Sequence, residues 1–282
     1  MTVAPAPAAN LARLAVDRLG HGPVVVLLHG IGGGRAIWGS EGSGTLQALA
    51  QAGFEALAFD LPGYGDSPLV ANGRGEPRLT IASMAKAVAD ALDAAGIARA
   101  WVVGHSMGGM VAQELAWAHA QRVSGLVLAC TSPAFGQANG AWQQAFLRDR
   151  LAPLDGGQGM AAVAARLVPA MVAPGIGEAV QARAAAVMAR VPEATYRAAL
   201  HALMGFDRRE ALAALRGPVL CLAAEHDRTA PLAVMQKMAQ RIAGAEFACV
   251  PAAGHIVNVE QPAAFHEALL GFLNRAAHAA AP

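Results

Sequence analysis

The chain has 282 residues, of which 55% are hydrophobic and only 15% are charged, and its formal net charge at pH 7 is +1. This length and apolar content suffice for a large core, and open α/β enzymes reach this size as one unit. The balanced, thinly spread charge gives no electrostatic reason to expect nucleic acid or an anionic membrane as a partner.

Apolar runs and helical patterns alternate through most of the chain. Seven strand-like runs occur, at residues 11–17, 23–28, 55–60, 100–104, 124–130, 218–224 and 245–251. Several are nearly continuous, which is typical of strands buried on both faces of a parallel sheet. Helical patterns follow many of them, at residues 43–52, 80–96, 107–120, 231–243 and 261–275. This order predicts a mostly parallel, doubly wound α/β sheet with right-handed crossovers.

One long stretch, residues 133–217, has no convincing strand. Its Ala-rich helical segments are separated by proline and glycine, at Pro153, Gly156-Gly157, Pro169, Pro174-Gly175 and Pro192. Ordinary crossover helices are the alternative, but about 85 residues is far more than one crossover needs. We therefore expect a helical cap over residues 133–217, inserted between the predicted strands 124–130 and 218–224 of a core formed by residues 1–132 and 218–282.

The most informative motif is Gly104-His105-Ser106-Met107-Gly108, which has the pattern G-x-S-x-G. An apolar run precedes it and a helical pattern follows it, so Ser106 is predicted at a sharp strand-to-helix corner, the nucleophile elbow. Neighbouring side chains would collide at such a corner, which favours glycine on both sides. The hydroxyl of Ser106 would then stand at a helix N-terminus, where the helix dipole favours a developing oxyanion.

Candidate partners of this serine follow two later strands. Asp227 comes after the run 218–224, and His255 comes after the run 245–251. The carboxyl ends of parallel strands meet at one edge of an open sheet, and the order Ser106, Asp227, His255 is that of nucleophile, acid and base. The serine needs a base to take its proton, and the histidine needs a carboxylate to orient it. Glu225 is the local rival of Asp227 as the acid.

A glycine-rich loop, His29-Gly30-Ile31-Gly32-Gly33-Gly34, follows the run 23–28. Its backbone amides are candidates for an oxyanion hole, formed by the N–H of Met107 together with that of Ile31 or Gly32. A phosphate or dinucleotide site is disfavoured, because the loop has no G-x-G-x-x-G pattern in the right context and no G-K-[ST]. No cluster has metal-ligand spacing, so we expect no metal and no cofactor. His29 and His105 are expected to be structural.

The cysteines and the first residues bear on the cellular compartment of the protein. Cys130, Cys221 and Cys249 each lie in or at the end of an apolar run, so we expect three buried thiols and no disulfide framework. Residues 1–20 have no basic segment followed by an apolar one, and the start is expected to be a loose tail. No window of 18 apolar residues occurs. The expectation is a cytoplasmic protein without a membrane span.

Several motifs together carry a family resemblance. They are His29-Gly30, the segment Asp60-Leu61-Pro62-Gly63-Tyr64-Gly65-Asp66-Ser67, the segment Gly104–Gly109, Asp227 and Gly254-His255. With them the chain resembles the α/β-hydrolase superfamily over essentially its whole length. Within it, residues 255–262 and Phe206-Asp207 resemble the 3-oxoadipate enol-lactonase group, and are compatible also with small carboxylesterases and C–C hydrolases.

The resemblance implies a cofactor-free serine hydrolase that cleaves a small ester or lactone through an acyl-enzyme on Ser106. A C–C bond hydrolase of aromatic meta-cleavage products and a non-catalytic small-molecule receptor are the alternatives. Large apolar side chains of the cap are candidates either to line the pocket or to form the core of the cap, namely Trp142, Phe146, Met160, Met171 and Met188. An enol-lactone bears a carboxylate, and Arg148 or Arg150 is the first candidate to bind it.

Overall fold

The computed structural model describes residues 9–69 and 79–279, and its centre is one eight-stranded sheet with the order β1-β2-β4-β3-β5-β6-β7-β8. The strands are β1 Ala9–Leu11, β2 Leu14–Gly20, β3 Val24–Leu28, β4 Glu55–Phe59, β5 Ala100–His105, β6 Val123–Ala129, β7 Val219–Ala224 and β8 Glu246–Val250. Strand β2 runs antiparallel to β1 and β4, and every other neighbouring pair is parallel. The predicted fold class is therefore confirmed.

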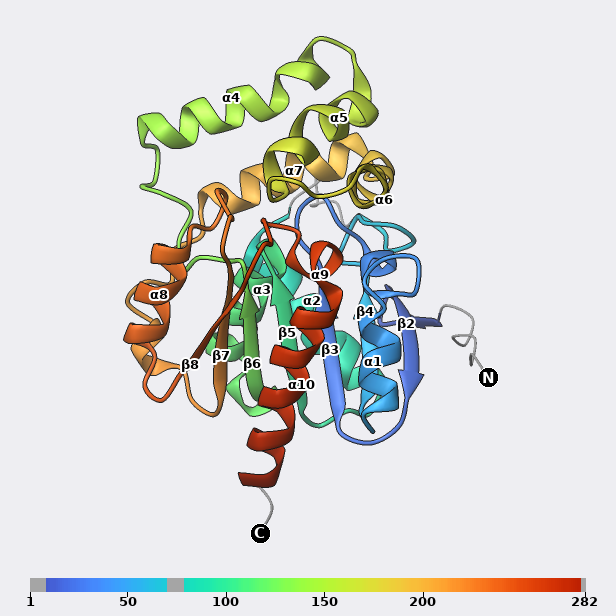
Figure 1. The fold of residues 1–282 in the computed structure, drawn as a ribbon, viewed down its shortest axis with the longest axis vertical. Helices are drawn as coiled ribbons and strands as arrows, with labels where there is room; N and C mark the ends of the chain where they lie inside the picture. Colours follow the sequence, from blue (N-terminus) through green and yellow to red (C-terminus); the bar gives the residue numbers. More distant parts are fainter. Residues whose placement is uncertain (1–8, 70–78, 280–282) are drawn as a thin grey trace.

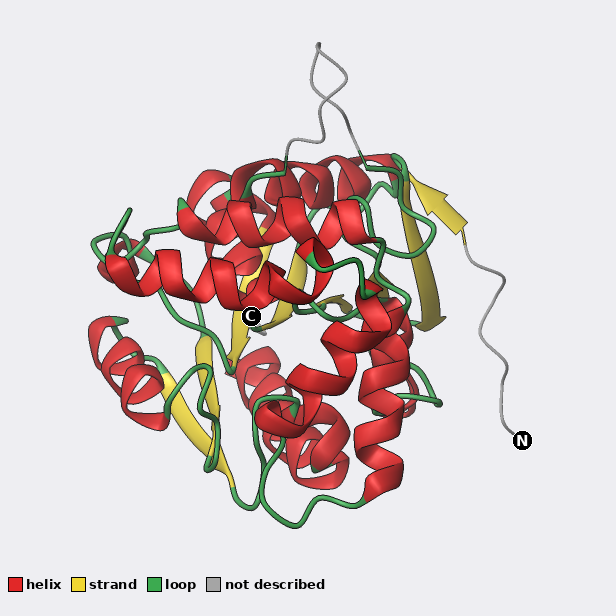
Figure 2. Ribbon diagram, turned by 90° about the horizontal axis from the view of Figure 1, so that it is seen from above, coloured by secondary structure: helices red, strands yellow, loops and turns green. Residues whose placement is uncertain are grey.

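Helices flank this sheet on both sides (Figure 1, Figure 2). They are α1 Thr45–Gln51, α2 Ile81–Ala94, α3 Met107–Ala118, α4 Ala141–Asp155, α5 Gly159–Met171, α6 Glu178–Ala189, α7 Glu193–Met204, α8 Leu232–Arg241, α9 Val257–Glu260 and α10 Pro262–Ala279. Short 3-10 helices occur at Arg35–Trp38, Ala120–Arg122 and Leu212–Ala214. In Figure 1, α1 and α10 lie in front of the sheet and α2 and α3 lie behind it. No helix of the described segments is long and apolar enough to cross a membrane.

The central strands are buried along their whole length, as their near-continuous apolar sequences predict. Every residue of β5 and of β7 is buried, and β6 is buried except at Ser124. The edge strand β8 differs, because it has only β7 as a neighbour and four of its five residues are exposed or partly exposed. Cys249 of β8 is exposed, so the expectation of three buried thiols was wrong at this position.

The N-terminal hairpin is the second departure from the sequence-based expectation. The predicted strand over residues 11–17 straddles a turn at Ala12 and Arg13, which joins β1 to β2. Both residues have positive φ, 45° and 78°, as a two-residue hairpin turn requires. Neither position holds the Gly or Asn that normally signals such a turn, so the sequence contained no local signal for this hairpin. The predicted tail falls mostly on residues 1–8, outside the described residues.

Helices α4–α7 occupy the interval between β6 and β7 and cover the end of the sheet at which the parallel strands finish (Figure 1). We call these four helices the cap helices. Pro153 and Pro169 were expected to separate helical segments. Instead they lie within the last turns of α4 and α5. Each helix continues for two residues past its proline, although the proline itself donates no backbone hydrogen bond.

Candidate active site

Ser106 stands at the corner between β5 and α3, in a backbone conformation that few side chains adopt. Its φ is +54°, in the left-handed region, which costs free energy for any residue other than glycine. The glycines make the corner possible. A Cβ on Gly104 would lie 2.3 Å from the carbonyl oxygen of Gly108, and one on Gly108 would lie 2.2 Å from the carbonyl oxygen of Leu28. The steric reason proposed from the G-x-S-x-G pattern thus has a counterpart in specific contacts.

The fold brings the three predicted catalytic residues into one hydrogen-bonded chain. Nε2 of His255 lies 2.9 Å from Oγ of Ser106, and Nδ1 of His255 lies 2.8 Å from Oδ2 of Asp227. Both His255 and Asp227 are almost completely buried. Glu225, the rival acid, has a half-exposed side chain that accepts a hydrogen bond from the amide of Ala252 instead.

Asp227 is held as a carboxylate by its surroundings. Its Oδ1 accepts hydrogen bonds from the amides of Thr229 and Ala230 at 2.7 and 2.9 Å, which leaves Oδ2 facing His255. Burial by itself would raise the pKa of Asp227, but His255 and these amides outweigh it and hold the pKa below the ordinary 3.8. A permanently charged acceptor fixes the His255 tautomer that carries its proton on Nδ1.

Three hydrogen bonds fix the backbone around His255. Its amide donates to the carbonyl oxygen of Met171, at the end of α5, at 2.7 Å. The amides of its neighbours Gly254 and Ile256 donate to the carboxylate of Glu260 at 2.7 and 2.9 Å. A Cβ on Gly254 would lie 2.5 Å from the oxygen of Met171, so the close approach of this loop to the end of α5 requires glycine there.

His105 supplies the fourth contact to this backbone. Its Nε2 donates to the carbonyl oxygen of His255 at 2.6 Å. Burial, reinforced by the neighbouring His255, lowers the pKa of His105 to about 3, so the ring stays neutral. The structural role expected for His105 therefore rests on a specific contact to the proposed base.

The candidate oxyanion hole lies next to Ser106. Ile31 and Met107 line the same cavity as Ser106, and neither backbone amide has an acceptor among the residues that the structure describes. The hydroxyl of Tyr64 donates to the carbonyl oxygen of Ile31 at 3.1 Å, which holds the peptide between Ile31 and Gly32. Gly32 lines an adjoining smaller cavity, where a Cβ would meet the terminal methyl of Met188 at 2.3 Å.

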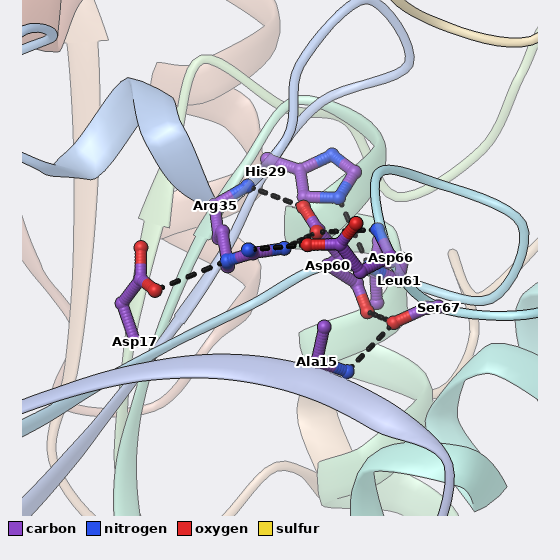
Figure 3. A network of polar contacts seen from close by, with 8 residues as sticks. All are labelled: Ala15, Asp17, His29, Arg35, Asp60, Leu61, Asp66 and Ser67. Carbon is purple, nitrogen blue, oxygen red and sulfur yellow. Dashed lines mark hydrogen bonds and ion pairs between the residues drawn. The ribbon is translucent and has the colours of Figure 1, made fainter. Parts of the chain in front are cut away.

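A partly buried ion cluster anchors the loop that carries Ile31 (Figure 3). The guanidinium of Arg35 contacts Asp60 directly and lies 3.1 Å from Asp17 and 2.6 Å from Asp66. The backbone amide of Arg35 also donates to Oδ1 of Asp60 at 2.7 Å. Burial disfavours the charge of Arg35, but the three carboxylates raise its pKa above the ordinary value.

His29 joins the same two loops from the other side (Figure 3). Its Nδ1 donates to the oxygen of Gly30 at 2.8 Å, and its Nε2 accepts from the amide of Leu61 at 3.0 Å. Burial lowers the pKa of His29, although Asp60 opposes the shift. A neutral ring with one donor and one acceptor nitrogen suits this position, which is the structural role expected of it.

A cavity of about 190 Å³ opens beside Ser106 and is closed on the far side by the cap helices. Of the predicted substrate-binding residues, Trp142, Phe146, Arg150 and Met188 line it. Arg148 does not, because its side chain is exposed on another face of α4; its prediction was wrong.

The two remaining cap methionines divide in the same way. Met171 lines the cavity, whereas Met160, at the start of α5, is buried among the core side chains and does not line it. Phe135 stacks near Trp142 and Phe146, with ring centroids 5.2 and 4.9 Å away, so one end of the cavity is aromatic.

Among the described residues, no group of three or more His, Cys, Asp or Glu side chains is placed to hold a metal ion.

Sequence reasoning missed several residues that build the site. Thr131 donates its hydroxyl to the carbonyl oxygen of Ser106 at 2.7 Å, and Glu260 accepts from three backbone amides, including that of Ala173 in the cap region. A signal for Glu260 existed, since a lone carboxylate directly after the mostly apolar segment 256–259 needs partners once buried. The role of Arg35 had no local signal, because its three carboxylates come from two segments distant in sequence, Asp17 in β2 and Asp60 with Asp66 after β4.

Comparison with known proteins agrees with this architecture. Residues 25–268 match the alpha/beta hydrolase family. A protein of Variovorax paradoxus, provisionally named carbamate hydrolase RutD, is 34% identical over 90% of this chain and 94% of its own length. Two solved structures are similar in fold. A thermophilic esterase from Thermogutta terrifontis has a TM-score of 0.82 at 25% identity, over 93% of both chains. The enol-lactonase of Burkholderia xenovorans has a TM-score of 0.80 at 26% identity, over 93% of this chain and 96% of its own chain. The chain therefore belongs to the alpha/beta hydrolase family.

Proposed function

We propose that the protein is a serine hydrolase that cleaves a small carboxylic ester or lactone through an acyl-enzyme on Ser106 and needs no cofactor. The observation that carries this proposal is the chain of hydrogen bonds from Ser106 through His255 to Asp227, at 2.9 and 2.8 Å. Nucleophile, base and orienting acid all lie within the distances that acyl transfer requires. An esterase and an enol-lactonase of similar fold support the choice of bond.

The reaction follows from this geometry. Oγ of Ser106 attacks the carbonyl carbon while Nε2 of His255 takes the hydroxyl proton, and Asp227 stabilises the resulting imidazolium. The tetrahedral oxyanion accepts hydrogen bonds from the amides of Ile31 and Met107. His255 then returns its proton to the departing oxygen, which leaves an ester between substrate and Ser106. Water, deprotonated by His255, hydrolyses that ester and regenerates the serine.

We propose further that residues 133–217 act as a cap on a catalytic core formed by residues 1–132 and 218–282. The cap helices supply the apolar roof of the cavity, through Phe146, Met171 and Met188. A volume of about 190 Å³ suits a small acyl group. The contact from the amide of His255 to Met171 ties the cap to the proposed base.

Carbamate hydrolysis is the second candidate, favoured by the name of the Variovorax paradoxus relative. A carbamate presents the same kind of carbonyl to Ser106 but has a nitrogen substituent, so the same triad could attack it. The complete hydrogen-bonded triad speaks against a non-catalytic receptor. No contact in the described part of the chain favours cleavage of a carbon–carbon bond over that of an ester.

The decisive experiment measures turnover of p-nitrophenyl esters, lactones, carbamates and meta-cleavage products by wild type and by Ser106→Ala. We expect Ser106→Ala to lower kcat for the preferred ester or lactone by about 10³ or more, with folding intact. A fluorophosphonate probe should label the wild type and not this variant. Ser124→Ala, at the start of β6 and outside the cavity wall, is the matched control. Turnover of Ser106→Ala near that of wild type would refute the proposal.

A further inference from the structure

The cavity wall beside Ser106 carries a positively charged side chain and, in the part of the chain that the structure describes, no negatively charged one. Arg150 is the single Lys or Arg among the described residues that line this cavity, and no Asp or Glu lines it with them. The rest of the wall is mostly apolar, including Phe146 and Met171. An apolar wall screens charge poorly, so one cation without a nearby anion attracts anionic ligands.

The position of Arg150 is set by its helix and by two aromatic rings. Trp142, Phe146 and Arg150 are spaced four residues apart on α4, so they share one face of the helix, and all three line the cavity. The guanidinium carbon of Arg150 lies 4.7 Å from the ring centroid of Phe146. Burial raises the pKa of Tyr196, and Arg150 opposes that shift from close by. Both rings hold the guanidinium in place without neutralising it.

Two other arginines of the cap helices have protein partners for their donors, and neither lines the cavity beside Ser106. Arg197 pairs with Asp155 and Glu193 at 2.7 and 2.8 Å, and Arg183 donates to the carbonyl oxygen of Gly42 at 2.9 Å. Arg150 forms no ion pair with any carboxylate in the described part of the chain. Apart from the hydrogen bond to the Tyr196 hydroxyl, its N–H donors remain available to a ligand, and the planar fork of a guanidinium matches the two oxygens of a carboxylate.

We infer, on the basis of the proposed ester or lactone hydrolysis, that the substrate carries a free carboxylate on its acyl chain and that Arg150 binds it. The carbonyl is held at Ser106 and the amides of Ile31 and Met107, and the acyl chain extends beneath the cap helices to Arg150. The substrate class is the monoester, or the carboxylate-bearing lactone, of a short dicarboxylic acid. Arg150 is thus a specificity-determining residue that contacts the part of the substrate remote from the reacting bond.

Two matched substrates test this inference. p-Nitrophenyl hydrogen glutarate and p-nitrophenyl pentanoate have acyl chains of equal length, and differ in a terminal carboxylate or methyl group. We expect Arg150→Met to raise KM for the glutarate ester at least tenfold and to change KM for the pentanoate ester less than threefold. Arg150→Lys should recover part of the loss, because it restores the charge without the fork. Arg148→Met, two residues away on the exposed face, should change neither value.

Binding of free glutarate to the Ser106→Ala protein, measured by calorimetry, gives a readout independent of turnover. Glutarate should bind this protein and should bind at least tenfold more weakly when Arg150→Met is added. Equal effects of Arg150→Met on KM for both esters, or an affinity for glutarate that Arg150→Met leaves unchanged, would overturn the inference. Neither result would contradict the proposed serine hydrolase mechanism. Failure of wild type to hydrolyse either ester would instead count against the proposed function.

Discussion

At the scale of single residues, two carboxylates two positions apart meet different environments. Asp227 follows β7 and turns back into the protein, where two backbone amides hold one of its oxygens and His255 takes the other. Glu225 leaves the same strand end on the solvent side and accepts from the amide of Ala252. Only the first can orient the proposed base, so the two residues differ in function although they share a loop.

Exchange of each carboxylate for its amide separates these roles. We expect Asp227→Asn to lower kcat for the preferred ester by a factor on the order of 10⁴, because the amide no longer fixes the His255 tautomer. Glu225→Gln should retain turnover within about threefold, since a surface hydrogen bond contributes little. Steady-state kinetics of both variants check this. The opposite ranking would mean that Glu225 is the catalytic acid.

At the scale of elements, the candidate oxyanion loop depends on a neighbouring segment for its shape. Residues 29–34 follow β3, residues 60–67 follow β4, and Arg35 with Asp60 joins the two segments (Figure 3). Asp60 is almost fully buried, so its charge needs the guanidinium nearby. The loop that carries Ile31 is thus joined to the segment after β4 by an ion cluster that does not itself reach the cavity beside Ser106.

Arg35→Met should therefore destabilise the protein more than the loss of an exposed ion pair. Leaving Asp60 buried without its partner is expected to cost about 3–5 kcal/mol of unfolding free energy. Arg18→Met removes the more exposed pair with Glu55 and should cost less than about 1 kcal/mol. Urea unfolding of both variants measures the difference. Equal losses would show that the Arg35 cluster contributes no more than a surface pair.

At the scale of the whole molecule, buried neutral histidines tie folding to pH. The pKa of His105 is about 3 in the folded protein, against about 6.5 for an exposed histidine. Between these values the unfolded chain binds a proton that the folded protein does not. Stability from this group is therefore complete above pH 6.5 and is lost as the pH falls toward 3.

His105→Gln removes this linkage and retains a side-chain N–H donor for the carbonyl of His255. The slope of unfolding free energy against pH, measured by urea titration between pH 6 and 4, should become shallower by about 1.4 kcal/mol per pH unit. His226→Gln serves as the control, because the side chain of His226 is 43% exposed and donates no buried contact. An unchanged slope in His105→Gln would contradict the assignment of a neutral, buried ring.

Local sequence was sufficient for most of the strands and helices and for the elbow at Ser106. Their signals are short-range, namely apolar periodicity and glycines beside a sharp corner, and neighbours along the chain satisfy them. The placement of Asp227 and His255 after successive strands also followed from sequence, because parallel strands end at a common edge. The hairpin at Ala12 and Arg13 had no such signal and was missed.

Side-chain direction was beyond local sequence. Arg148 and Arg150 are two residues apart on α4, and a helix turns by about 200° over that interval, so only one of them can face the cavity. Which one does so depends on how α4 lies on the core, a matter of packing between distant segments. Glu260 and Arg35 likewise gained their roles from partners far away in the sequence, and Cys249 became exposed because β8 lies at the sheet edge. Sequence periodicity indicates that a helix or strand has distinct faces, but contacts formed on folding select the face that meets the substrate.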